Sequence, residues 1–152
     1  MPYPRPPLQS IRMSQDPLSE LFSDHREETT ATHVLVVDDD EGVREFLAFE
    51  LGQVFQVDAV ASGEECLEFL AADGRPTPDV ITLDLMLPKR DGYKVLQTIR
   101  DEPKYLDVEV VVISGLGQGD STTKAFDLGA ADYVTKPVNV EELVRRIDRL
   151  VA

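Results

Sequence analysis

One apolar run with a carboxylate at its end constrains this chain more than any other feature. Residues 80–88 read Val-Ile-Thr-Leu-Asp-Leu-Met-Leu-Pro, and such a run is typical of a strand buried on both faces of a parallel sheet. A carboxylate is tolerated only at the carboxyl end of such a strand, where open α/β sheets place their ligand crevice. Pro88 and the Asp91-Gly92 pair mark the loop that follows. We therefore expect Asp84 to stand at a functional edge of the sheet.

Similar apolar runs recur along the chain and alternate with amphipathic stretches. The predicted strands are residues 33–37, 55–60, 79–83, 108–114 and 132–135. The first predicted helix follows Asp40 and carries Val43, Phe46, Leu47 and Leu51 on one stripe. The next three span residues 62–70, 92–101 and 121–128, and the last begins at Asn139. Five strands alternating with five helices through short connections predict a flavodoxin-like doubly wound α/β fold, a parallel five-stranded sheet in the order 2-1-3-4-5.

Acidic residues follow the first and third strands, between which the crevice of this fold lies. Asp38 and Asp39 come after the first strand, and Asp84 ends the third. Three neighbouring carboxylates raise one another's pKa unless a cation neutralises them, and oxygen ligands suit Mg²⁺. Lys136, after the fifth strand, can reach the same crevice, and Ser114 adds a hydroxyl from the fourth. Together these groups predict a phosphoryl-transfer site.

The motifs that carry this pattern resemble those of the receiver domains of two-component response regulators. The resemblance covers residues 32–152, which would form the receiver domain behind an arm of residues 1–31. The matching motifs are Val-Val-Asp-Asp-Asp at 36–40, Leu-Asp-Leu-Met-Leu-Pro at 83–88, Asp-Gly at 91–92, Ile-Ser-Gly at 113–115 and Gly-Ala-Ala-Asp-Tyr-Val-Thr-Lys-Pro at 129–137. Each of them is weak by itself, but five in the family's order, each near a strand end, are specific.

The resemblance implies a chemical role for each acid. Asp84 would accept a phosphoryl group from the phosphohistidine of a cognate histidine kinase or histidine phosphotransfer protein. Asp39, Asp84 and the backbone carbonyl of Met86 would hold Mg²⁺, with Asp38 assisting largely through water. Asp40 would only cap the helix that follows, because an Asp side chain accepts hydrogen bonds from unpaired helical N–H groups.

The resemblance also implies a switch. Ser114 and Tyr133 would form the switch pair, and the alternative for Tyr133 is that it is merely an edge-strand aromatic residue. Lys136 would bind the phosphoryl group, and its peptide bond to Pro137 would be cis. The signal would reach a downstream protein target through the surface of the helix at 121–128, the strand at 132–135 and the last helix.

In this family the residues two positions after the acceptor and two after the switch hydroxyl border the path of the water that hydrolyses the acyl phosphate. Here they are Met86 and Leu116, which are apolar and orient water poorly. A long-lived phospho-Asp84 is therefore expected.

Two alternatives remain beside this interpretation. A haloacid-dehalogenase-type phosphatase also uses an Asp nucleophile and Mg²⁺, but its first motif wants Thr or Val where Gly42 stands. The receiver interpretation predicts no enzyme activity beyond the protein's own phosphorylation and dephosphorylation. Because the sequence stops at Ala152, we expect either a stand-alone receiver without an output domain or a fragment of a larger regulator or hybrid kinase.

Charge and composition limit the partners. With 15 Lys and Arg against 29 Asp and Glu, the net charge of −14 disfavours a nucleic-acid partner. The single cysteine, Cys66, excludes an internal disulfide and fits a reducing cytoplasm, where we place the protein. No apolar run approaches the roughly 18 residues of a membrane span, so membrane insertion is not expected.

Residues 1–31 differ from the rest of the chain. They hold five of the ten prolines and no sustained apolar periodicity, which favours a flexible arm. Within them, Asp16 and Pro17 could open a short helix that carries Leu18, Leu21 and Phe22 on one face. The alternatives are that this stretch is disordered, or that translation begins at Met13.

Overall fold

The computed structural model describes residues 31–87, 91–115 and 120–152. The stretch 16–22 and the residues Pro88 and Leu116 lie outside the described residues. The sheet has five parallel strands in the order β3-β2-β4-β5-β6, which confirms the predicted order 2-1-3-4-5. The strands are β2 (His33–Val37), β3 (Gln56–Val60), β4 (Val80–Asp84), β5 (Glu109–Ser114) and β6 (Asp132–Thr135).

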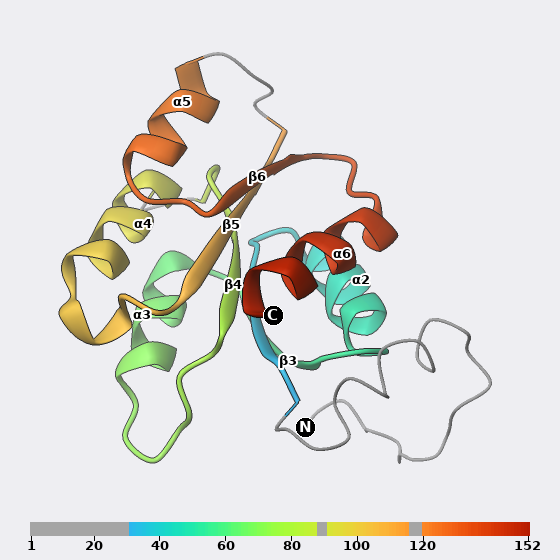
Figure 1. Cartoon of the computed structure of the whole chain (residues 1–152), viewed down its shortest axis with the longest axis horizontal. Helices are drawn as coiled ribbons and strands as arrows, with labels where there is room; N and C mark the ends of the chain where they lie inside the picture. The colour runs from blue at the N-terminus through green and yellow to red at the C-terminus, as the bar shows by residue number, and fades with distance from the viewer. Residues whose placement is uncertain (1–30, 88–90, 116–119) are drawn as a thin grey trace.

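Helices cover both faces of this sheet (Figure 1). They are α2 (Glu41–Leu51), α3 (Gly63–Ala71), α4 (Gly92–Asp101), α5 (Asp120–Asp127) and α6 (Val140–Val151), with a 3₁₀ turn, η2, at Pro103–Tyr105. Helices α3, α4 and α5 lie on one face, and α2 and α6 lie on the other. Among the described helices, none combines the length and the apolar character that crossing a membrane requires.

The central strands are buried, as their continuous apolar runs predict. All five residues of β2 and all five of β4 are buried, because helices pack on both sides of these strands. The outer strand β3 is less buried, with Gln56 exposed, Val57 buried and its last three residues half-buried. Cys66 of α3 lies fully inside the hydrophobic core, and burial raises the pKa of its thiol to about 12. It is therefore a core side chain and an unreactive thiol.

Short polar side chains begin four of the helices. Each accepts a hydrogen bond from the backbone N–H three residues on, as N-caps do. The pairs are Asp40 with Val43 (3.0 Å), Ser62 with Glu65 (3.1 Å), Asp91 with Lys94 (3.1 Å) and Asn139 with Glu142 (2.9 Å). Glu142 does not close a capping box, because its carboxylate accepts from Arg145 and Arg146 instead.

One predicted helical stripe differs from the structure. Phe46 was grouped with Leu47 and Leu51, which are buried, but its side chain is 48 % exposed. The buried side of α2 is centred on Leu47, Ala48 and Leu51, so Phe46 points away from the sheet. Phe49, one turn further on, is 65 % exposed and shares that outward face.

A close backbone approach fixes the connection between β4 and α4. The N–H of Gly92 donates to the carbonyl of Leu85 across 3.0 Å. A Cβ atom at position 92 would stand 2.5 Å from both the carbonyl oxygen of Asp84 and the Cα of Leu85. Only glycine therefore lets α4 begin this close to the end of β4.

We expect Gly92→Ala to lower the free energy of unfolding by about 1–3 kcal/mol, because the clash is with backbone atoms that cannot rotate away. Gly115→Ala is the matched control, since no atom of the described residues lies within 4 Å of a Cβ built there. Thermal or urea denaturation of both variants measures the difference. Equal stabilities would contradict the close approach.

Candidate functional site

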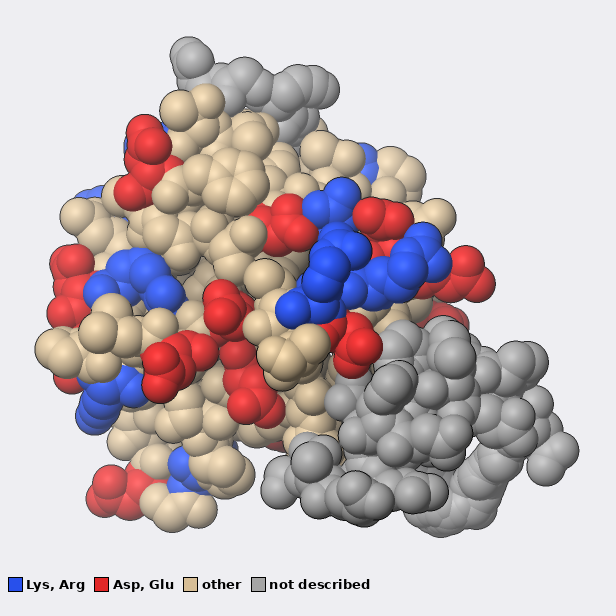
Figure 2. All heavy atoms as spheres, in the orientation of Figure 1, with Lys and Arg blue, Asp and Glu red and all other residues tan. Residues whose placement is uncertain are grey.

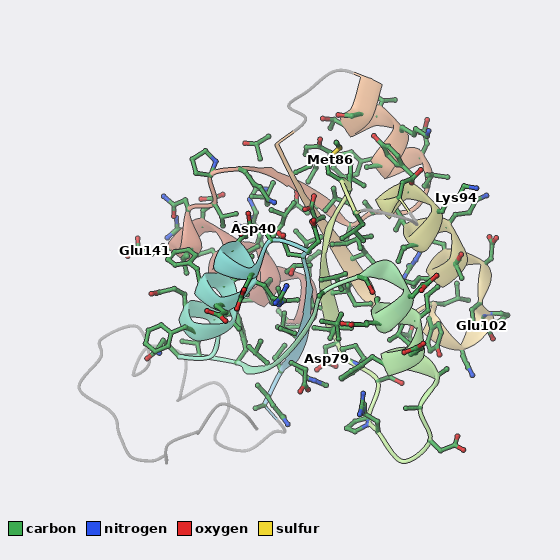
Figure 3. The ribbon with its side chains drawn as sticks, turned by 180° about the vertical axis from the view of Figure 1, so that it is seen from behind. Asp40, Asp79, Met86, Lys94, Glu102 and Glu141 are labelled. Atoms are coloured by element: carbon green, nitrogen blue, oxygen red, sulfur yellow. The ribbon has the colours of Figure 1, made fainter. Side chains whose placement is uncertain are left out.

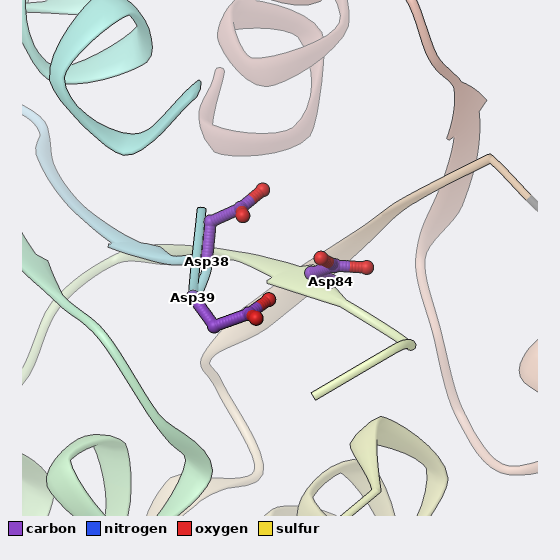
Figure 4. A group of neighbouring side chains, drawn as sticks. All are labelled: Asp38, Asp39 and Asp84. Carbon is purple, nitrogen blue, oxygen red and sulfur yellow. The ribbon is translucent and has the colours of Figure 1, made fainter. Parts of the chain in front are cut away.

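The acids predicted to meet are brought together by the pairing of two strands. Strands β2 and β4 are neighbours, with Val37 opposite Leu83, so the residues that follow them share one edge of the sheet. Carboxylate oxygens of Asp38, Asp39 and Asp84 all lie within 4.8 Å of one another. Figure 4 shows the side chains of Asp38 and Asp39 projecting from the loop after β2 toward Asp84 at the end of β4.

A single ammonium group joins the two buried acids. Lys136 Nζ lies 3.1 Å from Asp38 Oδ2 and 3.2 Å from Asp84 Oδ2. Asp38 and Asp84 are only 2 % and 4 % exposed, whereas Asp39 is exposed. The pocket therefore has two buried carboxylates at its base and one at its solvent side. The peptide bond between Lys136 and Pro137 is cis, as predicted.

Burial and charge act against each other at these groups. Burial raises the pKa of Asp38, although the N–H of Asp40 and the ammonium of Lys136 work to lower it. Burial alone would lower the pKa of Lys136, but contacts with Asp38 and Asp84 outweigh it, so that pKa lies above its usual value. Lys136 thus stays charged, and three carboxylates face one cation.

Backbone and arginine donors orient the acids. The N–H of Met86 donates to Asp84 Oδ1 (2.9 Å), so both oxygens of Asp84 hold a hydrogen bond. The N–H of Asp40 donates to Asp38 Oδ1 (2.9 Å), and Arg44 Nη1 donates to the Asp38 carbonyl (3.1 Å). This role of Arg44 was not predicted from the sequence. The only feature of the sequence that could have indicated it is the position of Arg44 one helical turn after the N-cap Asp40.

The donor set fits a hard divalent cation. All three side chains offer oxygen ligands, and two carboxylates in excess of the lysine leave negative charge for a metal to neutralise. The described residues include no other group of three or more Asp, Glu, His or Cys side chains with this spacing. The cluster can therefore hold Mg²⁺.

Ser114 is placed beside this pocket by β5, the strand next to β4. Its side chain is fully buried, and its carbonyl accepts from the backbone N–H of Lys136 across 3.0 Å. This hydrogen bond holds the backbone of Lys136 next to the end of β5. Figure 3 shows Met86 and Asp40 in the upper part of the molecule and Asp79, which precedes β4, in the lower part.

The hydroxyl of Tyr133 contacts α5 and not the acid cluster. Its ring is partly buried against the core, and its hydroxyl lies 3.0 Å from Ser121 Oγ. Tyr93 of α4 donates to the Ser121 carbonyl (3.2 Å), and Lys124 Nζ lies 4.3 Å above the Tyr93 ring. This contact between α4, α5 and β6 was not predicted, because Ser121 carries no recognisable signal in the sequence.

Comparison with known proteins identifies the class that this fold and pocket define. The family model of the response regulator receiver domain matches residues 34–148, and the chain belongs to that family. Receiver domains are signalling modules of two-component systems in which phosphorylation and Mg²⁺ binding are typical. The haloacid-dehalogenase alternative is not favoured by this match.

Three relatives illustrate the likeness. The chain is 35 % identical over 119 residues to the DNA-binding dual master transcriptional regulator RpaA of Synechocystis, covering 78 % of this chain and 48 % of RpaA. A putative response regulator from Chloroflexus aurantiacus is 32 % identical, with a TM-score of 0.73 over 80 % of this chain and 98 % of that one. The beryllofluoride-activated receiver domain of DrrB, from Thermotoga maritima, is 31 % identical, with a TM-score of 0.71 over the same shares. The chain spans about half the length of the curated relatives it matches.

We expect Lys136→Met to lower the free energy of unfolding by about 1–3 kcal/mol without Mg²⁺, because two buried carboxylates lose their shared cation. The estimate is reduced from that for a fully buried pair because the Lys136 side chain is partly exposed. Millimolar Mg²⁺ should narrow the deficit, since a metal replaces the missing charge. Lys94→Met, on the exposed side of α4, is the control. Thermal denaturation checks both, and an identical loss in the two variants would contradict the shared role of Lys136.

Proposed function

We propose that this protein is a phosphorylation-dependent switch in which Asp84 accepts a phosphoryl group from the phosphohistidine of a histidine kinase or histidine phosphotransfer protein. The observation that carries the proposal is the placement of Asp84. Its carboxylate is buried, oriented by the N–H of Met86 and the ammonium of Lys136, and adjacent to two further acids. A buried carboxylate held in this way beside a cation would be a positioned nucleophile.

In the proposed reaction an oxygen of Asp84 forms a bond to phosphorus as the bond from phosphorus to the donor histidine nitrogen breaks. The imidazole leaves and takes up a proton. Mg²⁺ would be held by Asp39, Asp84 and the Met86 carbonyl, with Asp38 assisting, and would neutralise charge on the phosphoryl oxygens. Lys136 would bind another of those oxygens, and its contact with Asp84 supports this role.

We expect acetyl phosphate to label Asp84, or beryllofluoride to occupy it, only when Mg²⁺ is present. Asp84→Asn should abolish labelling. Asp40→Asn should not affect it, because Asn also caps α2 and Asp40 is outside the three-acid cluster. Intact-mass spectrometry and Phos-tag electrophoresis measure the label. Undiminished labelling of Asp84→Asn would remove Asp84 from the nucleophile role.

The proposed switch links the pocket to the surface of α5, β6 and α6. The hydroxyl of Ser114 would move onto the phosphoryl group, and the Tyr133 ring would turn inward. In the structure Tyr133 is held by Ser121 at the start of α5, so such a turn would break the contact between β6 and α5. A downstream protein target would recognise the changed surface.

We expect beryllofluoride with Mg²⁺ to change backbone hydrogen exchange in α5 and β6, while α3 on the far side of the pocket changes little. Ser114→Ala should remove this response because the hydroxyl is lost, and Ser114→Thr should retain it. Hydrogen-exchange mass spectrometry measures all three proteins. A full response in Ser114→Ala would contradict the role of the hydroxyl.

The proposal extends to the organisation of the chain. Residues 32–152 would be the receiver domain, 1–31 an appended arm, and signalling would proceed by protein binding rather than by nucleic-acid contact. RpaA, a DNA-binding relative, is about twice as long as the region it shares with this chain. The protein acts either as a receiver without an output domain or as part of a longer regulator or hybrid kinase. Its mass in extracts of its source cells distinguishes these two forms.

The side chain of Met86 should also set the lifetime of phospho-Asp84. Met86 is 59 % exposed, and its N–H donates to Asp84 Oδ1, so this residue stands directly beside the acceptor carboxylate. We expect Met86→Asn to speed loss of phosphate several-fold, because an amide can orient the attacking water. Met86→Leu, which stays apolar, is the control. The decay of labelled, purified protein is the measurement, and equal rates in both variants would contradict this role. Leu116, the second position expected to matter, lies outside the described residues.

A further inference from the structure

The outer face of α2 carries two aromatic side chains that the pocket does not use. Phe46 and Phe49 are 48 % and 65 % exposed, and their spacing of three residues places them side by side on one face. The other large apolar side chains exposed in the described residues, Met86, Leu106 and Phe126, lie on separate elements. The pair on α2 is therefore a small apolar surface and not a scattered exposure.

We propose that residues 16–22 of this same chain dock on the outer face of α2, over Phe46 and Phe49. The stretch reads Asp-Pro-Leu-Ser-Glu-Leu-Phe, and at helical spacing it presents Leu18, Leu21 and Phe22 together. That three-residue apolar face matches the size of the exposed pair. A helix as short as this is unstable by itself in water, so it would form only when its apolar face packs against such a surface.

The point where the chain enters the fold makes this contact reachable. The carbonyl of Thr32 accepts from the N–H of Gln56, and the N–H of Phe55 donates to the carbonyl of Leu51 at the end of α2. The arm therefore joins the domain next to the carboxyl end of α2. The ten residues from Phe22 to Thr32 can span up to about 33 Å, and α2 is only about 16 Å long.

Charge does not decide where the segment lies. Residues 16–28 hold five acidic residues and one arginine. Helix α2 is itself net acidic, and α6, which shares that face of the sheet, carries three arginines and three acidic residues. Figure 2 shows Lys and Arg side chains gathered near α6, but Arg145 and Arg146 are already paired with Glu142 and Asp132. The proposed contact therefore rests on the apolar side chains and on the short connection.

Cysteine pairs in the full chain test the contact. Phe22→Cys combined with Phe49→Cys should form an intramolecular disulfide in oxidised glutathione about tenfold faster than Phe22→Cys with Phe126→Cys, whose second thiol lies on α5 across the sheet. That factor corresponds to about 1.4 kcal/mol. The native Cys66 does not compete, because it is buried and the pKa of its thiol is raised to about 12. Non-reducing electrophoresis and peptide mass mapping follow the reaction.

A second comparison removes differences in tether length. Adding Leu18→Asp to the Phe22/Phe49 cysteine pair should slow the disulfide by about the same factor, whereas Leu8→Asp, outside the docking segment, should leave it unchanged. Equal rates for the two cysteine pairs, or no effect of Leu18→Asp, would overturn the proposal. Disulfides formed only between chains would also overturn it, since the occupant would then be a second copy. No outcome depends on phosphorylation of Asp84.

Discussion

The salt bridge from Lys136 to Asp38 and Asp84 is the interaction on which the functional edge of this protein depends. It joins the last residue of β4 to residues that directly follow β2 and β6, and so ties both halves of the sheet together at their carboxyl ends. Without a cation, two buried carboxylates in contact are costly, and the fold would gain by protonating or expelling one of them. The lysine makes the acid pair stable enough to exist while leaving it one positive charge short of neutrality. That remaining negative charge would favour a divalent cation beside the acids.

Most of the fold was predictable because each local signal agrees with the global one. The continuous apolar runs of β2 and β4 mark central strands, the alternation in β3 marks an edge, and capping residues mark the helix starts. The grouping of Asp38, Asp39 and Asp84 followed as well, because strand order decides which strand ends are neighbours. In a parallel sheet all strands end at the same edge, so the strand order is enough to predict which strand-end residues are neighbours.

The features that were not predictable depend on side-chain direction rather than on element order. Arg44 reaches back to the carbonyl of Asp38, and Ser121 meets the hydroxyl of Tyr133, but neither has a spacing that distinguishes it from a solvated polar residue. Phe46 was assigned to the wrong face because four apolar residues within nine positions fit more than one helical stripe. Such choices are settled by packing between helix and sheet, which a single sequence does not specify.

The close approach of Gly92 to the end of β4 has a consequence for how this chain can vary. The hydrogen bond from Gly92 to Leu85 closes the connection between β4 and α4 at its base, immediately beyond Asp84. The backbone that carries Asp84 is thus held from the side of α4 as well as by its neighbours in the sheet, so a change that displaces the start of α4 would also displace the acid.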